Sequence, residues 1–169
     1  PGFLSYPILA RLAGAQAKAY ALGPGGGLDP GLFGLALSTS PNARMAVINH
    51  PANPTGAGAD PASLLAVARL CEERGIILVS DEVYRELYLG PRPASLRDAS
   101  AYGIVLSSAS KAWGGPGLRV GWALGEPEIL APARLVHNYA VTAASRPAQE
   151  AALALIEDSP RVLPQARAG

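Results

Sequence analysis

The residues with the clearest chemical potential surround a lysine that follows an apolar run. The run YGIVLSS (102–108) is typical of a strand, Lys111 comes three residues after it, and Arg119 lies eight residues beyond the lysine. A lysine amine forms a Schiff base with an aldehyde when burial or neighbouring charges lower its pKa. An arginine binds a phosphate through two parallel hydrogen bonds, and the hydroxyl of Ser108 is a further candidate donor. The stretch 108–122 therefore indicates a nucleophile close to an anion site.

Two upstream segments carry groups that suit a pyridine-ring aldehyde with a phosphate, such as pyridoxal 5'-phosphate. A buried carboxylate such as Asp81, in SDEVYRELYLG (80–90), keeps a pyridine nitrogen protonated so that the ring can absorb negative charge. The phenol of Tyr84 and the amide of Asn53, in HPANPTG (50–56), can each donate a hydrogen bond to a phenolic oxygen. Together with Lys111, these residues predict one cofactor site.

The elements that must position these groups alternate along the chain. Short β-branched runs are separated by helical stretches, which is the pattern of an α/β domain with a mostly parallel sheet. Asp60 followed by Pro61 predicts a helix start, and glycine with proline predicts a loop at 23–31. We expect strands at 17–22, 45–50, 76–81, 102–108 and 120–124, and helices at 5–13, 28–37, 61–75, 127–143 and 147–157.

The candidate residues come where predicted strands end. Asn53, Asp81 and Lys111 each follow the end of a strand within a few residues. Ligands of open α/β sheets bind outside the carboxyl ends of the strands, so we expect these side chains to meet at one edge. Taken singly, each has an ordinary explanation, since most lysines are solvated and Asn-Pro-Thr-Gly is a turn signal by itself. Their combination favours a site.

Composition and charge exclude several other classes. The 169 residues suffice for one domain, and a net charge of +1 favours neither a nucleic acid nor a membrane surface as partner. The single cysteine, Cys71, rules out an intrachain disulfide and fits a reducing compartment, so we expect the cytoplasm. The sequence contains no run of 18 apolar residues and no visible signal peptide. It begins with Pro1, which we interpret as the mark of a fragment or a processed product.

Two other patterns can be set aside. Residues 108–111 match the S-x-x-K motif of serine β-lactamases, but the chain has neither S-D-N nor K-T-G, and glycines follow the lysine where a helix would continue. The glycines of 23–31 have the spacing of neither a dinucleotide-binding loop nor a Walker loop. His50 and His137 have no partner spacing that suggests a metal site.

The motifs together resemble the aspartate aminotransferase family over almost the whole chain. The resemblance implies a three-layer α/β sandwich around a mixed, mostly parallel sheet of seven strands. It makes residues 1–163 most of the pyridoxal-phosphate-binding large domain and 164–169 a tail. It also implies roles for the site residues: Lys111, Asp81 and Tyr84 as catalytic groups, and Asn53, Asp81, Tyr84, Ser108, Ser110, Lys111 and Arg119 as cofactor ligands.

The implied reaction moves an amino group between an amino acid and a 2-oxo acid, in a homodimer with its active sites at the interface. Lys111 would release the cofactor and then act as the general base at the substrate's α-carbon. The resemblance also implies parts outside this chain: an aromatic residue that stacks on the cofactor ring, an N-terminal phosphate-binding turn, and a small domain whose arginine binds the substrate carboxylate. A β-elimination, a decarboxylation or a cyclisation would use the same residues and stays open, as does a regulatory domain without catalysis.

Overall fold

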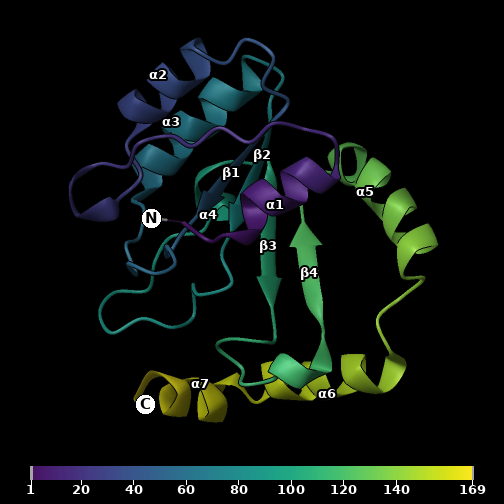
Figure 1. Cartoon of the computed structure of the whole chain (residues 1–169). Coiled ribbons are helices and arrows are strands. Elements are labelled where there is room, and N and C mark those ends of the chain that lie inside the picture. Colours follow the sequence, from purple (N-terminus) through teal and green to yellow (C-terminus); the bar gives the residue numbers. More distant parts are fainter. Residues whose placement is uncertain (1, 169) are drawn as a thin grey trace.

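The computed structural model describes residues 2–168, and a four-stranded sheet forms the centre of this part of the chain (Figure 1). The strands are β1 (Met45–Asn49), β2 (Ile77–Asp81), β3 (Ile104–Ser108) and β4 (Gly121–Leu124), in that spatial order. The first three are parallel, and β4 is antiparallel to β3. The predicted mixed, mostly parallel sheet is confirmed, although these residues contain four of the seven strands that the resemblance implied.

Three helices bury one face of the sheet: α2 (Pro30–Ser38), α3 (Pro61–Glu72) and the short α4 (Leu96–Ala99). As predicted, α3 begins after Asp60, whose side chain accepts a hydrogen bond from the backbone of Ser63. It turns one apolar face to the sheet, because its buried residues recur at helical spacing. The core cluster consists of Phe33, Ile48, Leu64, Val67, Ala68, Cys71, Ile76, Leu78, Leu96 and Val105.

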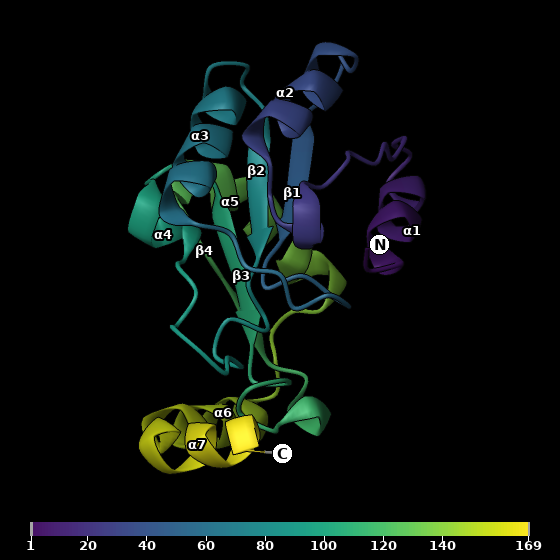
Figure 2. The same ribbon diagram turned by 90° about the vertical axis from the view of Figure 1, so that its left-hand side faces the viewer.

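The opposite face of the sheet carries α1 (Ser5–Leu12), which Figure 2 shows on the other side of the strands from α3 and α4. Helices therefore lie on both sides of the sheet, as the three-layer prediction required. α1 has no buried residue, and its apolar side chains Ile8, Leu9 and Leu12 are exposed, as is Leu4 just before the helix. Only its Tyr6 makes a polar contact with the sheet among the described residues.

The last part of the chain forms α5 (Pro127–Ala140), α6 (Arg146–Glu157) and α7 (Ser159–Ala168). α6 and α7 lie across the end of the sheet where β3 finishes, next to the 3-10 turn Pro116–Leu118 (Figure 1). The indole of Trp113 donates a hydrogen bond of 2.9 Å to Ser159 Oγ, so the segment after β3 is attached to the start of α7.

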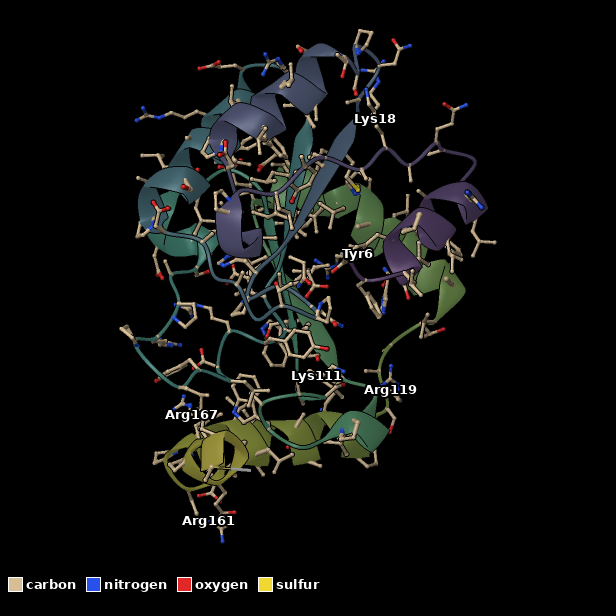
Figure 3. The ribbon with its side chains drawn as sticks, turned by 60° about the vertical axis from the view of Figure 1, so that its left-hand side comes forward. Tyr6, Lys18, Lys111, Arg119, Arg161 and Arg167 are labelled. Atoms are coloured by element: carbon tan, nitrogen blue, oxygen red, sulfur yellow. The ribbon has the colours of Figure 1, made fainter. Side chains whose placement is uncertain are left out.

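One expectation about local structure is wrong. Residues 17–22 form no strand, because they pair with no neighbour and Tyr20 packs edge-on against Phe33 at 5.2 Å. The predicted tail is helical over its described residues, 164–168, because α7 continues to Ala168. Arg167 explains part of this order, since its guanidinium lies 3.9 Å from the ring centre of Tyr88 and donates to the carbonyl of Glu86. Figure 3 shows Arg167 turned toward the rest of the molecule and Arg161 turned away from it.

Candidate active site

All seven predicted site residues line one cavity of about 390 Å³. It lies at the carboxyl edge of the sheet, because the parallel strands β1, β2 and β3 end there at Asn49, Asp81 and Ser108. Lys111 and Arg119 lie near one another at this edge (Figure 3). A cavity of this size is within the range of small-molecule sites, about 300–1,000 Å³.

Asp81 ends β2 with its carboxylate on the side of the sheet that α1 covers. Side chains alternate along a strand, so Leu78 and Ser80 are buried on the opposite face while Asp81 reaches the cavity. The hydroxyl of Tyr6 donates to Asp81 Oδ2 at 2.6 Å, and the backbone N–H of Val83 donates to Oδ1 at 3.2 Å. Both oxygens are therefore held in place before any ligand binds.

Asn53, Tyr84 and Lys111 form a second group in the cavity. Asn53 Nδ2 lies 3.3 Å from the hydroxyl of Tyr84, and Lys111 Nζ lies 5.3 Å from the centre of the Tyr84 ring. Asn49 positions this group, because its Oδ1 accepts from the backbone of Asn53 at 2.8 Å and its Nδ2 donates to the carbonyl of Asp81 at 3.0 Å. The amide, the phenol and the amine can thus all reach one ligand.

The remaining predicted residues surround the end of β3 and the turn before β4. The backbone N–H of Ser110 donates to Ser108 Oγ at 3.3 Å, which keeps the Ser108 hydroxyl at the cavity. Arg119 has a left-handed backbone, with φ 55° and ψ 38°, and its guanidinium donates to the carbonyl of Pro116 at 2.9 Å. A left-handed arginine is strained, and strain of this kind is concentrated at functional sites.

Sequence reasoning missed seven residues that line the cavity, and Phe3, Tyr6 and Asn49 are the ones among them with side chains that contact other site groups. Asn49 could have been found, because it lies one residue before the end of the strand predicted at 45–50. Phe3 and Tyr6 had no local signal, since their place depends on how α1 crosses the sheet. The rings of Phe3 and Tyr6 meet edge-on at 5.5 Å. Two aromatic side chains from the start of the chain thus line the cavity.

Comparison with known proteins places this geometry in a family. The model for aminotransferase class I and II matches residues 1–168. The chain belongs to this family. Class I and II aminotransferases depend on pyridoxal phosphate, which agrees with the residue types in the cavity.

Named aminotransferases from other organisms are similar over most of this chain. An aspartate/prephenate aminotransferase of Thermus thermophilus is 33% identical over 154 residues, which cover 90% of this chain and 40% of that protein. A probable N-succinyldiaminopimelate aminotransferase of Mycobacterium tuberculosis is 33% identical over 161 residues, which cover 92% of this chain and 41% of that protein. A solved aspartate aminotransferase of Thermus thermophilus superimposes with a TM-score of 0.89 at 32% identity, over 99% of this chain and 45% of its own. The chain thus spans less than half the length of these relatives.

Within residues 2–168, no helix is long and apolar enough to cross a membrane. The same residues contain no group of three or more histidine, cysteine or acidic side chains that could hold a metal ion.

Proposed function

We propose that this chain is the cofactor-binding part of a pyridoxal-phosphate-dependent aminotransferase, which moves an amino group between an amino acid and a 2-oxo acid. The observation that carries the proposal is the single cavity in which an amine, a carboxylate, a phenol–amide pair and a guanidinium meet. Pyridoxal phosphate would supply an aldehyde for the amine and a pyridinium ring that absorbs negative charge.

The residues of the cavity fit this cofactor in charge and chemistry. Asp81 is the carboxylate for the ring nitrogen, and Tyr6 and Val83 already hold it in place. Asn53 Nδ2 and the Tyr84 hydroxyl are close enough to donate to the same ring oxygen. The phosphate would bind Arg119 with the hydroxyls of Ser108 and Ser110, which line the same cavity.

Each of these residues then has a defined task in the reaction. Lys111 would bind the aldehyde carbon covalently and, once released, serve as the general base at the α-carbon of the substrate. Asp81 would keep the ring nitrogen protonated, because a nearby negative charge favours the charged form of that nitrogen. Tyr84 and Asn53 would stabilise negative charge on the ring oxygen. The same residues serve other reactions at the α-carbon, so the products decide between transamination, elimination, decarboxylation and cyclisation.

We extend the proposal to a homodimer that uses amino acid and 2-oxo acid substrates, by analogy with the family. The cytoplasm is the compartment that we propose, because the single thiol of Cys71 is unpaired and buried.

The chain contains two lysines, Lys18 and Lys111, and this allows a test with an internal control. The purified chain is incubated with pyridoxal phosphate, reduced with borohydride and digested, and the added mass is assigned by peptide mapping. We expect one adduct per chain on Lys111. Lys18 should stay unmodified, because its amine is outside the cavity and donates to the carbonyl and hydroxyl of Thr39.

The variants Lys111→Ala and Lys18→Ala form a matched pair. The first should lose the adduct and the visible absorption of the bound cofactor, and the second should keep both. Equal labelling of the two lysines, or an adduct that survives Lys111→Ala, would show unspecific amine chemistry and end the assignment. Product analysis with candidate amino acids then separates an oxo acid from pyruvate with ammonia, or from carbon dioxide.

A further inference from the structure

A buried histidine and a buried glutamate lie beside the cavity and have no role in the function proposed above. His50 is 3% exposed and Glu82 is 2% exposed, and His50 Nε2 lies 3.4 Å from Glu82 Oε1. Each comes directly after a cavity residue that ends a strand, since His50 follows Asn49 and Glu82 follows Asp81. Burying two ionisable groups is costly unless they interact with each other and with further polar groups.

Glu82 connects several segments through its carboxylate. Oε1 accepts a hydrogen bond of 2.9 Å from Ser80 Oγ and one of 2.8 Å from the backbone of Leu96. Burial by itself raises the pKa of Glu82, but His50 and the hydrogen bonds from Leu96 and Ser95 outweigh it and lower the pKa below its usual range. Glu82 is therefore a buried anion one residue away from Asp81.

His50 connects the Asn53 turn to the segment after β2. Its backbone N–H donates to the carbonyl of Asp81 at 3.1 Å, the same carbonyl that accepts from Asn49. Among the described residues, neither ring nitrogen of His50 has a partner with hydrogen-bond geometry. Attraction to Glu82 is thus the polar interaction that offsets the burial of the imidazole.

We propose that His50 and Glu82 are a positioning pair for the cofactor site. Their attraction holds the turn 50–56 against residues 81–84 and so sets where Asn53 and Tyr84 place their donors. The proposal rests on the function proposed above, because the two donors, 3.3 Å apart, would share one oxygen of the cofactor. A purely structural role is a poorer explanation, since an apolar pair of similar volume would stabilise a core as well or better.

The first measurement needs no cofactor. Amide hydrogen exchange is followed by mass spectrometry in peptides covering 49–56 and 80–88, for the wild-type chain, His50→Leu and His50→Gln. We expect His50→Leu to speed exchange in both segments together, because the link between them is lost. His50→Gln retains a donor that can reach Glu82 and should recover part of the protection.

The second measurement is the dissociation constant of pyridoxal phosphate, with the pH at which its visible absorption changes. His50→Leu should weaken binding by roughly tenfold, because the hydrogen bonds from Asn53 and Tyr84 to the ring oxygen would form less well. It should also shift the pH of the spectral change, because Asn53 and Tyr84 would no longer donate together to the ring oxygen. His50→Gln should fall between His50→Leu and the wild type.

Cys71→Ser is the matched control for a loss of stability alone, since Cys71 is fully buried in the core and remote from the cavity. If His50→Leu lowers stability as Cys71→Ser does but leaves exchange and affinity at the site unchanged, the positioning role is wrong. If the wild-type chain binds no pyridoxal phosphate, the proposed function fails and the cofactor role of the pair fails with it. In that case, the hydrogen-exchange data alone test whether His50 and Glu82 join the two segments.

Discussion

The hydroxyl of Tyr6 donates a hydrogen bond of 2.6 Å to Oδ2 of Asp81, across 75 residues of sequence. Burial and this hydrogen bond raise the pKa of Tyr6, so the phenol stays protonated and remains a donor at neutral pH. The bond connects α1 to the end of β2 and fixes the carboxylate that we assign to the pyridine nitrogen. α1 is thus part of the site, although none of its residues was predicted to be.

Replacing Tyr6 with phenylalanine should therefore weaken the cofactor site without disturbing the sheet. Hydrogen bonds to charged groups contribute about 1.5–3 kcal/mol when they are well protected, and Tyr6 is only half-buried, so we expect a loss near the lower limit. The dissociation constant of pyridoxal phosphate should rise roughly tenfold. Tyr20→Phe, which removes a phenol that does not line the cavity, is the control. Equal effects of the two substitutions would argue against a role for the Tyr6–Asp81 bond.

Replacing Arg119 should weaken cofactor binding while changing the stability of the fold very little. Glycine at this position adopts the left-handed backbone without strain. The substitution removes one exposed hydrogen bond, from the Arg119 guanidinium to the carbonyl of Pro116. We expect Arg119→Gly to change the free energy of unfolding by less than about 1 kcal/mol, because these effects oppose each other. Affinity for pyridoxal phosphate should nevertheless fall at least about tenfold with the loss of a bidentate phosphate ligand. Arg119→Lys, which keeps the charge without the fork, should bind with intermediate affinity. Unchanged affinity in Arg119→Gly would remove Arg119 from the site.

Gly103 should tolerate no side chain. Its φ is +102°, and a Cβ would lie 2.9 Å from Leu96 Cδ2 and 3.0 Å from the carbonyl oxygen of Leu78. We expect Gly103→Ala to lower the free energy of unfolding by about 2 kcal/mol or more, through backbone strain and crowding. Gly90→Ala is the control, because a Cβ there meets nothing within 4 Å. Urea unfolding measures both, and similar values for the two variants would contradict this reading of the turn before β3.

Alkaline pH should destabilise the fold partly through Cys71. Burial raises the pKa of Cys71 from 9.0 to about 12, so the folded chain keeps a proton that the unfolded chain releases. This contribution to stability is complete below pH 9 and is lost as the pH rises toward 12, with a maximum on the order of 4 kcal/mol for a difference of three pH units. The free energy of unfolding, measured by urea between these pH values, should fall less steeply in Cys71→Ala. Burial also raises the pKa of Tyr20 to about 12. Tyr20 therefore adds to the fall of stability with pH, and Cys71→Ala retains this part. Parallel curves for the two chains would show that the Cys71 thiol does not contribute.

Local features of the sequence were sufficient for the strands that carry the site and for the helix caps. The apolar runs before Asp81 and Lys111 are strands, and Asp60 with Pro61 starts α3, because these signals depend on residues only a few positions apart. Residues 17–22 show the limit of such signals. They carry a pattern compatible with a strand, but a strand needs a partner, and the structure offers none at that position.

The sequence by itself determined which chemical groups stand at the strand ends, since Asn53, Asp81 and Lys111 are read directly from its motifs. Only the tertiary structure decided what surrounds them: Tyr6 on Asp81, Asn49 between two segments, and His50 against Glu82. The physical reason is distance along the chain. The strand and cap signals arise between near neighbours, whereas these contacts join residues 4 to 75 positions apart and mostly depend on how separate elements pack.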